Sequence, residues 1–161
     1  MTIIFSSQPF YGQYVRRSTP HDPVSPNIFN NGKLWPFFWG CLGAIDGTHI
    51  PISPPATLQN LYRNRKGFIS QNCLYICNFD MLFMYILAGW EGSVTDSRIW
   101  ADALAKGSSS TVPDGFYYLV DAGFPHCKEL LIPFCAVRYH LQEWGAAGVR
   151  YVPCLLHLIF C

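Results

Sequence analysis

The run GCLGAIDGTHIPI, residues 40–52, holds a single carboxylate, Asp46, inside a stretch that is otherwise mostly apolar or small. The run lies between Gly40 and the prolines that begin at Pro51, and its isoleucines favour a strand. Burying an unpaired carboxylate costs on the order of several kcal/mol. The run therefore predicts a buried strand whose charged residue is compensated by a group from outside it.

Length and composition favour one domain with a substantial core. The 161 residues are 50% hydrophobic and 13% charged, which argues against a disordered chain. A net charge of +1 neither supports nor excludes a DNA partner, so any such binding depends on local clusters. Seven cysteines without a CxxC pair favour buried thiols over a zinc ribbon or a disulfide framework. We expect no signal peptide and no membrane span, and hence a soluble intracellular protein.

The pattern along the chain predicts a sequence of alternating elements. Residues 1–36 are expected to form an extended arm with a short helix near its start, and residues 145–161 an atypical tail. Between them, residues 37–144 would form an α/β domain. Its expected elements are the strand at 40–52, a loop or short helix at 56–68, a hairpin turning at 78–80, a helix within 92–107, a strand within 116–124 and a short helix within 126–134. The helix within 92–107 would present Ile99, Ala103 and Leu104 to the core, begin at a Ser or Thr cap and stop at Gly107.

Three aspartates share one local pattern. Asp46, Asp96 and Asp121 each lie beside a small residue, at or just past an apolar element. If their elements are neighbours the carboxylates converge and repel one another, and Mg²⁺ or Mn²⁺ relieves that repulsion. Such a site is suited to phosphoryl transfer.

Other interpretations of these carboxylates stay open at this point. Asp-Gly is also a turn dipeptide, and Asp96 could act only as a helix cap. Paired carboxylates also serve glycoside hydrolysis. Asp80 and Asp114 are predicted to be turn residues.

Five ordered segments carry a family resemblance. They are GAIDGTHI (43–50), YRNRKGFISQN (62–72), GWEGSVTDSRIW (89–100), YYLVDAGFP (117–125) and PFCAVRYHLQEW (133–144). They resemble the signature blocks of the PIF/Harbinger transposase-derived nucleases, the DDE superfamily endonucleases, most closely the plant members. The resemblance implies a ribonuclease H-like fold, a mixed sheet flanked by helices. It also implies that Asp46 and Asp121 are catalytic and that Asp46, Asp96 and Asp121 bind a divalent metal cation, Mg²⁺ or Mn²⁺.

The resemblance also implies partners and a location. DNA would be the substrate, a Myb-like DNA-binding protein a further partner, and the nucleus, or the nucleus and cytoplasm, the place of action. The fold would be incomplete at the C-terminus: family members carry a downstream glutamate that completes the metal site, whereas no acidic residue follows Trp144 here. Glu143 is a poor substitute. We therefore expect an impaired nuclease, with a noncatalytic module that binds DNA or a Myb-like protein as the alternative.

The densest basic cluster is Arg63, Arg65 and Lys66, which would contact DNA phosphates or else form a solvated loop. His49 could support the metal site or be a hydrogen-bonded structural histidine. Arg98 and Arg138 could pair with the acidic centre, with Tyr139 and His140 packed beneath it. Core positions are expected for Trp90, Trp100, Cys73 and Cys77.

Overall fold

A computed structural model describes residues 15–16, 19, 22–105 and 112–133 of the chain. Its centre is a five-stranded sheet with the strand order β3-β2-β1-β4-β5. The strands are β1 (Cys41–Pro51), β2 (Ser70–Cys77), β3 (Phe83–Glu91), β4 (Tyr117–Leu119) and β5 (Leu130–Leu131). The helical elements within the described ranges are α3 (Pro26–Phe29), the 3₁₀ turn η1 (Ala56–Leu58) and α4 (Asp96–Ala105).

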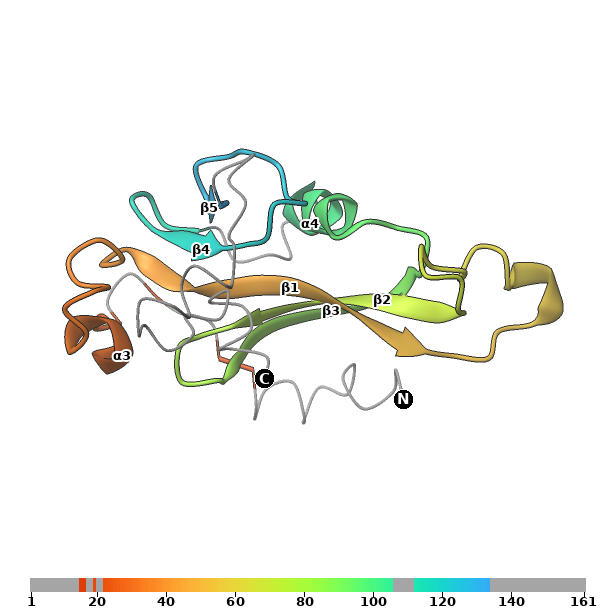
Figure 1. The fold of residues 1–161 in the computed structure, drawn as a ribbon, viewed down its shortest axis with the longest axis horizontal. Coiled ribbons are helices and arrows are strands. Elements are labelled where there is room, and N and C mark those ends of the chain that lie inside the picture. The colour runs from red at the N-terminus through yellow and green to blue at the C-terminus, as the bar shows by residue number, and fades with distance from the viewer. Residues whose placement is uncertain (1–14, 17–18, 20–21, 106–111, 134–161) are drawn as a thin grey trace, which may run out of the picture.

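The sheet is mixed, as the resemblance to ribonuclease H implied. β1, β2 and β3 form an antiparallel meander, whereas β4 lies parallel to β1 and β5 parallel to β4. The segment that holds η1 projects beyond one end of the sheet, and α3 lies at the other end (Figure 1). The α/β fold class predicted from the sequence is therefore confirmed.

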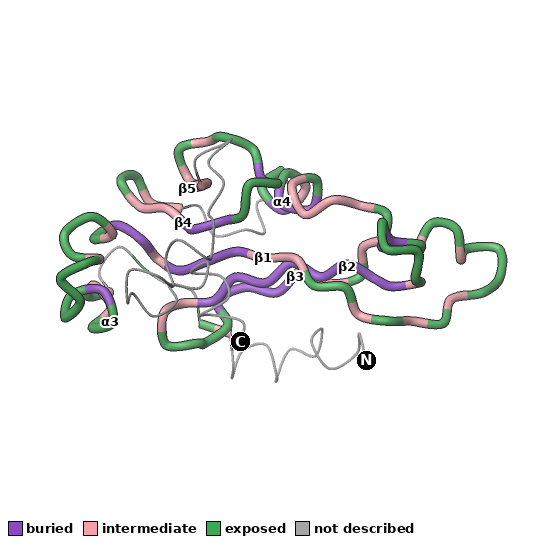
Figure 2. Tube along the Cα trace, viewed as in Figure 1, coloured by how far each residue is buried: buried purple, intermediate pink, exposed green. Residues whose placement is uncertain are grey.

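The central strands are buried, as Figure 2 shows for β2. On one face, Ile99, Trp100 and Ala103 of α4 pack with residues of β1 and β2 that include Ile45 and Leu74. A second cluster joins the fully buried Ile28 of α3 to Cys41 and Ala44 of β1, so the part of the predicted arm that the structure describes contributes to the core. Trp100, Cys73 and Cys77 are buried and Trp90 packs against the main cluster, which confirms the core positions expected for them.

The hairpin predicted at 78–80 is confirmed. The Asn78 side-chain oxygen accepts hydrogen bonds from the backbone N–H groups of Asp80 and Leu82, at 3.0 and 2.9 Å, and so closes the turn between β2 and β3. Asp114 likewise lies in a turn, where it pairs with Lys128 at 3.1 Å. Asp80 and Asp114 are thus turn residues, as predicted.

Two expectations about local structure are wrong. Residues 126–133 hold the short strand β5 rather than a helix, because Leu130 and Leu131 pair with Tyr118 and Leu119 of β4. Leu104 does not face the core: its exposed fraction is 42%, since Ile99, Trp100 and Ala103 already fill the buried stripe of α4. The stop at Gly107, the helix near the start of the arm and the tail lie outside the described residues.

Candidate active site

Asp46 lies within β1 and is half-buried, as is Gly47 after it, whereas Ile45 before it is fully buried. Its Oδ1 accepts a hydrogen bond of 2.8 Å from the Gly47 backbone N–H. Burial raises the pKa of the Asp46 carboxyl to about 6; the Gly47 N–H opposes the rise, and the charges of Asp96 and Asp121 add to it. The charges of Asp96, at the start of α4, and of Asp121, after β4, therefore both act on Asp46 in β1.

Asp96 reaches this region because Gly47 has no side chain. A Cβ atom on Gly47 would overlap the carboxyl carbon and both carboxylate oxygens of Asp96. Gly47 lies in the middle of a strand, paired with Leu74 of β2, so the turn interpretation of Asp46-Gly47 is wrong. The glycine instead leaves room for the acidic residue that begins α4.

Asn72 of β2 fixes the Asp96 carboxylate. The Asn72 Nδ2 donates hydrogen bonds to Asp96 Oδ1 at 2.6 Å and to the backbone oxygen of Val94 at 3.0 Å. Asn72 is 1% exposed, and its Oδ1 is buried with no hydrogen-bond partner in the part of the chain that the structure describes. Sequence reasoning missed Asn72; the available signal was the polar pair Gln71-Asn72 at the start of a β-rich run.

Asp121 follows β4, the parallel neighbour of β1, and is exposed. Its Oδ1 accepts a hydrogen bond of 2.9 Å from the Gly123 backbone N–H, so the carboxylate is held by its own loop. Because β1 and β4 run in the same direction, the chain leaves β4 alongside the middle of β1. This arrangement places the Asp121 charge where it acts on Asp46.

The carboxylate oxygens are suitable ligands for a hard divalent cation, but the described residues do not supply a complete set of ligands. Carboxylate oxygens are the protein ligands that Mg²⁺ prefers, and Mg²⁺ commonly uses one or two of them together with water and substrate phosphates. Among the described residues, no group of three or more His, Cys, Asp or Glu side chains is arranged to hold an ion. The carboxylates would therefore supply only some of the ligands of such an ion, and substrate oxygens and water would supply the others.

The basic cluster lies in the loop before β2. Arg63, Arg65 and Lys66 are exposed, whereas Asn64 between them is buried. The Asn64 side-chain oxygen accepts from the backbone N–H groups of Lys66 and Phe68, at 3.0 and 3.3 Å, and so shapes the loop. Arg63 is directed back to the loop, since its Nη1 donates to the Gly67 oxygen at 2.8 Å.

His49 connects β1 to this basic loop. Its Nδ1 lies 3.0 Å from Ser70 Oγ, which also accepts a 3.2 Å hydrogen bond from Asn64 Nδ2. The His49 ring meets Phe68 edge-on, with the ring centroids 6.3 Å apart. The hydrogen-bonded interpretation of His49 is thus the one that the geometry favours.

The remaining predicted residues are less informative. Arg98 is exposed on the first turn of α4. Arg138, Tyr139, His140 and Glu143 lie outside the described residues.

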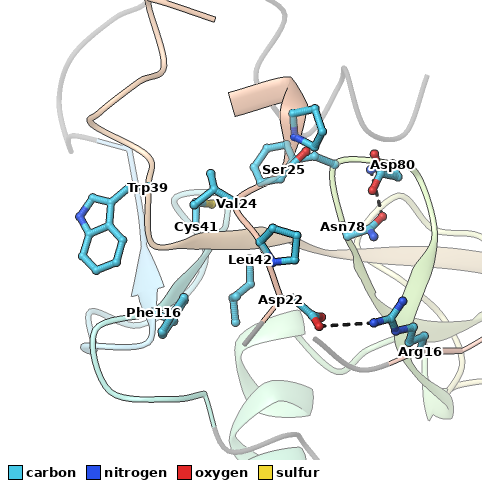
Figure 3. A pocket seen from close by; sticks show the side chains of 13 residues that line it. Arg16, Asp22, Val24, Ser25, Trp39, Cys41, Leu42, Asn78, Asp80 and Phe116 are labelled. Atoms are coloured by element: carbon cyan, nitrogen blue, oxygen red, sulfur yellow. Dashed lines mark hydrogen bonds and ion pairs between the residues drawn. The ribbon is translucent and has the colours of Figure 1, made fainter. Parts of the chain in front are cut away.

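A pocket of about 230 Å³ lies elsewhere and contains none of the predicted site residues. It is bounded by the start of β1, the turn at Asn78–Asp80 and the chain before α3 (Figure 3). Arg16 and Asp22 form an ion pair of 3.3 Å along its wall. The carboxylates and this pocket thus occupy separate places.

Comparison with known proteins assigns the family. The profile of the DDE superfamily endonuclease family matches residues 45–147, which include Asp46, Asp96 and Asp121. The chain therefore belongs to the DDE superfamily endonucleases, and the family resemblance seen in the sequence is confirmed. No solved structure matches the chain.

Relatives come from animals and from a plant. "Putative nuclease HARBI1" of Rattus norvegicus is 31% identical over 108 residues, which cover 66% of this chain and 30% of the relative. The Mus musculus protein of the same name is 30% identical, over 76% of this chain and 36% of its own length. "Protein ALP1-like" of Arabidopsis thaliana is 34% identical, over 72% of this chain and 26% of the relative. The chain thus spans about a third of the length of these relatives.

None of the helices in the described ranges is long and apolar enough to cross a membrane.

Proposed function

We propose that this chain forms part of a divalent-metal-dependent nuclease domain that cleaves phosphodiester bonds in DNA. Asp46 and Asp121 are the catalytic carboxylates, and Asp96 joins them as a metal ligand. The observation that carries the proposal is geometric: the Asp96 carboxylate packs against Gly47, the residue after Asp46, and Asp121 follows the strand that runs parallel to β1. Carboxylates that repel one another at a half-buried position gain most from a bound cation.

The roles of the residues follow from their surroundings. A bound divalent ion would activate water and stabilise the negative charge that develops on the phosphate. Asp46 must be ionised to serve as a ligand, so its raised pKa makes the site available above about pH 6. Arg65 and Lys66, exposed on the loop that Asn64 shapes, would contact phosphates of the DNA backbone. In the reaction, a water oxygen bonds to phosphorus, one P–O ester bond breaks, and the leaving oxygen takes up a proton.

We further propose that turnover by this chain is low. Residues 145–161 contain no Asp or Glu, so the 161 residues considered alone supply no carboxylate after Trp144 that could act as the downstream glutamate of the family. Preorganised charge stabilisation is often the largest catalytic contribution, and losing one ligand reduces it by orders of magnitude.

A noncatalytic module that binds DNA or a Myb-like protein is the second candidate. The open ligand set among the described carboxylates favours it. In either case we place the protein in the nucleus, where its DNA would be.

Two measurements on the full chain test the proposal. Calorimetry with Mn²⁺ should show binding by the wild type that Asp46→Ala abolishes and that Asp114→Ala, a change in an exposed turn carboxylate, preserves. The same samples are then tested for nicking of supercoiled plasmid. Binding together with Asp46-dependent nicking supports the nuclease, whereas metal binding without nicking supports the noncatalytic module. A folded wild type that binds no Mn²⁺ would refute the metal site.

A further inference from the structure

Asn72 is the one buried polar side chain in direct contact with a carboxylate of the candidate site, within the described residues. Both N–H groups of its amide have acceptors, Asp96 Oδ1 at 2.6 Å and the Val94 oxygen at 3.0 Å. The first is a short hydrogen bond to an ionisable group, the kind that orients a carboxylate most strongly. The second ties the chain just before α4 to the same amide.

The orientation of this amide is determined by its acceptors. If the amide were turned over, its oxygen would face both the Asp96 carboxylate and the Val94 carbonyl, and oxygen would oppose oxygen at hydrogen-bond distance. The observed orientation avoids this but leaves Asn72 Oδ1 buried without a partner in the part of the chain that is described. A leucine at this buried strand position would avoid that cost, but it could not hold Asp96.

Asn72 and Gly47 restrain Asp96 from two directions. Gly47 of β1 provides the space into which the carboxylate fits, and Asn72 of β2 donates to one carboxylate oxygen. The loop before α4 is also held, because a Cβ atom on Gly92 would overlap Ser70 Oγ and the backbone oxygens of Ser70 and Tyr62. Asp96 is therefore positioned by the sheet and not only by its own helix.

We infer that Asn72 is a positioning residue for the metal site: its amide holds Asp96 Oδ1 and thereby aims the other carboxylate oxygen at the cation. The inference rests on the proposed function and deepens it. Partners that orient a metal ligand through hydrogen bonds commonly contribute 10- to 100-fold to metal affinity. Replacing Asn72 should therefore weaken Mn²⁺ binding by about that factor, without any change in the ligands themselves.

The test compares Asn72→Leu with Gln71→Leu in the full chain. Gln71 is a matched control, because it is the adjacent buried polar residue of β2 and its amide contacts Cys73 rather than a carboxylate. Mn²⁺ affinity is measured by calorimetry, and side-chain amide NMR shows whether the Asn72 N–H resonance shifts in Asp96→Asn. If Asn72→Leu does not fold, Asn72→Ser, which is shorter and cannot span the distance to Asp96, takes its place.

The outcomes separate the inference from the proposed function. A 10- to 100-fold loss in the Asn72 variant, little change in Gln71→Leu and an amide shift in Asp96→Asn support the inference. Wild-type Mn²⁺ binding that the Asn72 variant retains in full overturns the inference and leaves the proposed function in place. A folded wild type that binds no Mn²⁺ overturns both, and an amide resonance unaffected by Asp96→Asn overturns the contact itself.

Discussion

The carboxylate of Asp96 lies against the backbone of Gly47, in the space that a side chain at position 47 would fill. The two residues are far apart in the sequence, one in the middle of β1 and the other at the start of α4. Gly47 thus has a steric role between two of the proposed metal ligands, which explains why a glycine follows Asp46 inside a strand.

Gly47→Ala should therefore displace Asp96. The added methyl group must move the carboxylate or the helix, which costs about 1–3 kcal/mol of unfolding free energy, as overpacking usually does. Urea unfolding measures the loss. Gly32→Ala is the control, because a Cβ atom there meets nothing within 4 Å, and it should change stability by less than about 1 kcal/mol. Equal stability of the two variants would contradict the close packing of Gly47 and Asp96.

Asp46→Asn should stabilise the metal-free protein at high pH. The pKa of Asp46 is about 6 in the folded protein, above its ordinary 3.8, so between these values the folded state binds more protons than the unfolded chain. Stability from this group is greatest below about pH 4 and is lost as the pH rises through 6. The variant should therefore gain about 1–2 kcal/mol at pH 8, a value discounted because the carboxyl is partly exposed, and little at pH 4.

Denaturant unfolding at the two pH values checks this expectation. Gly32→Ala serves as the control, since it changes no ionisable group and its added Cβ atom meets nothing within 4 Å, so its effect on stability should be the same at pH 4 and pH 8. A loss of stability in Asp46→Asn at pH 8 would mean that a favourable partner already compensates Asp46 in the folded chain.

Mn²⁺ binding should itself depend on pH. A ligand must lose its proton before it coordinates, and the pKa of Asp46 lies near 6. Affinity should be nearly constant above pH 7 and fall about tenfold for each pH unit below 6. Calorimetry between pH 5 and pH 8, in a buffer that does not bind the metal, measures this dependence. An affinity that is flat down to pH 5 would show that Asp46 is not a ligand.

Local pattern was enough to predict the elements that depend on neighbouring residues. β1, the hairpin of β2 and β3, and α4 follow from apolar runs, turn residues and helical spacing, and all three are present. β5 did not follow, because a two-residue strand has no periodicity and exists only through its pairing with β4. Leu104 was misplaced for a related reason, since the width of the buried stripe on α4 depends on the sheet beneath it.

The charged residues of the candidate site could be predicted from the sequence, but the residues that hold them in position could not. Asp46, Asp96 and Asp121 share a local signature, and the sequence therefore singled them out. Asn72 has no such signature: a buried amide within a strand acquires its role from Asp96, a residue 24 positions away. A turn at Asp46-Gly47 stayed open as an alternative because the residue that packs against Gly47, Asp96, could not be inferred from the neighbours of Gly47 in the sequence.

Arg65 and Lys66 should contribute to DNA affinity in a salt-dependent way that Arg63 does not share. All three are exposed, but Arg63 donates to the Gly67 oxygen and so helps to close the loop. Each cation that neutralises a phosphate adds nearly one unit to the slope of log affinity against log salt. Arg65→Ala and Lys66→Ala should each reduce that slope by about one, whereas Arg63→Ala should weaken binding through loop shape.

Fluorescence anisotropy with a labelled duplex, titrated at several salt concentrations, measures both quantities. Lys33→Ala is the matched control, because Lys33 is an exposed lysine of the segment between α3 and β1 and should leave affinity and slope unchanged. Asn64→Ala should weaken binding without removing a charge, because the Asn64 oxygen holds the backbone N–H groups of Lys66 and Phe68. If Arg65→Ala and Lys66→Ala behave like Lys33→Ala, the basic loop is a solvated surface and DNA contacts must come from another part of the protein.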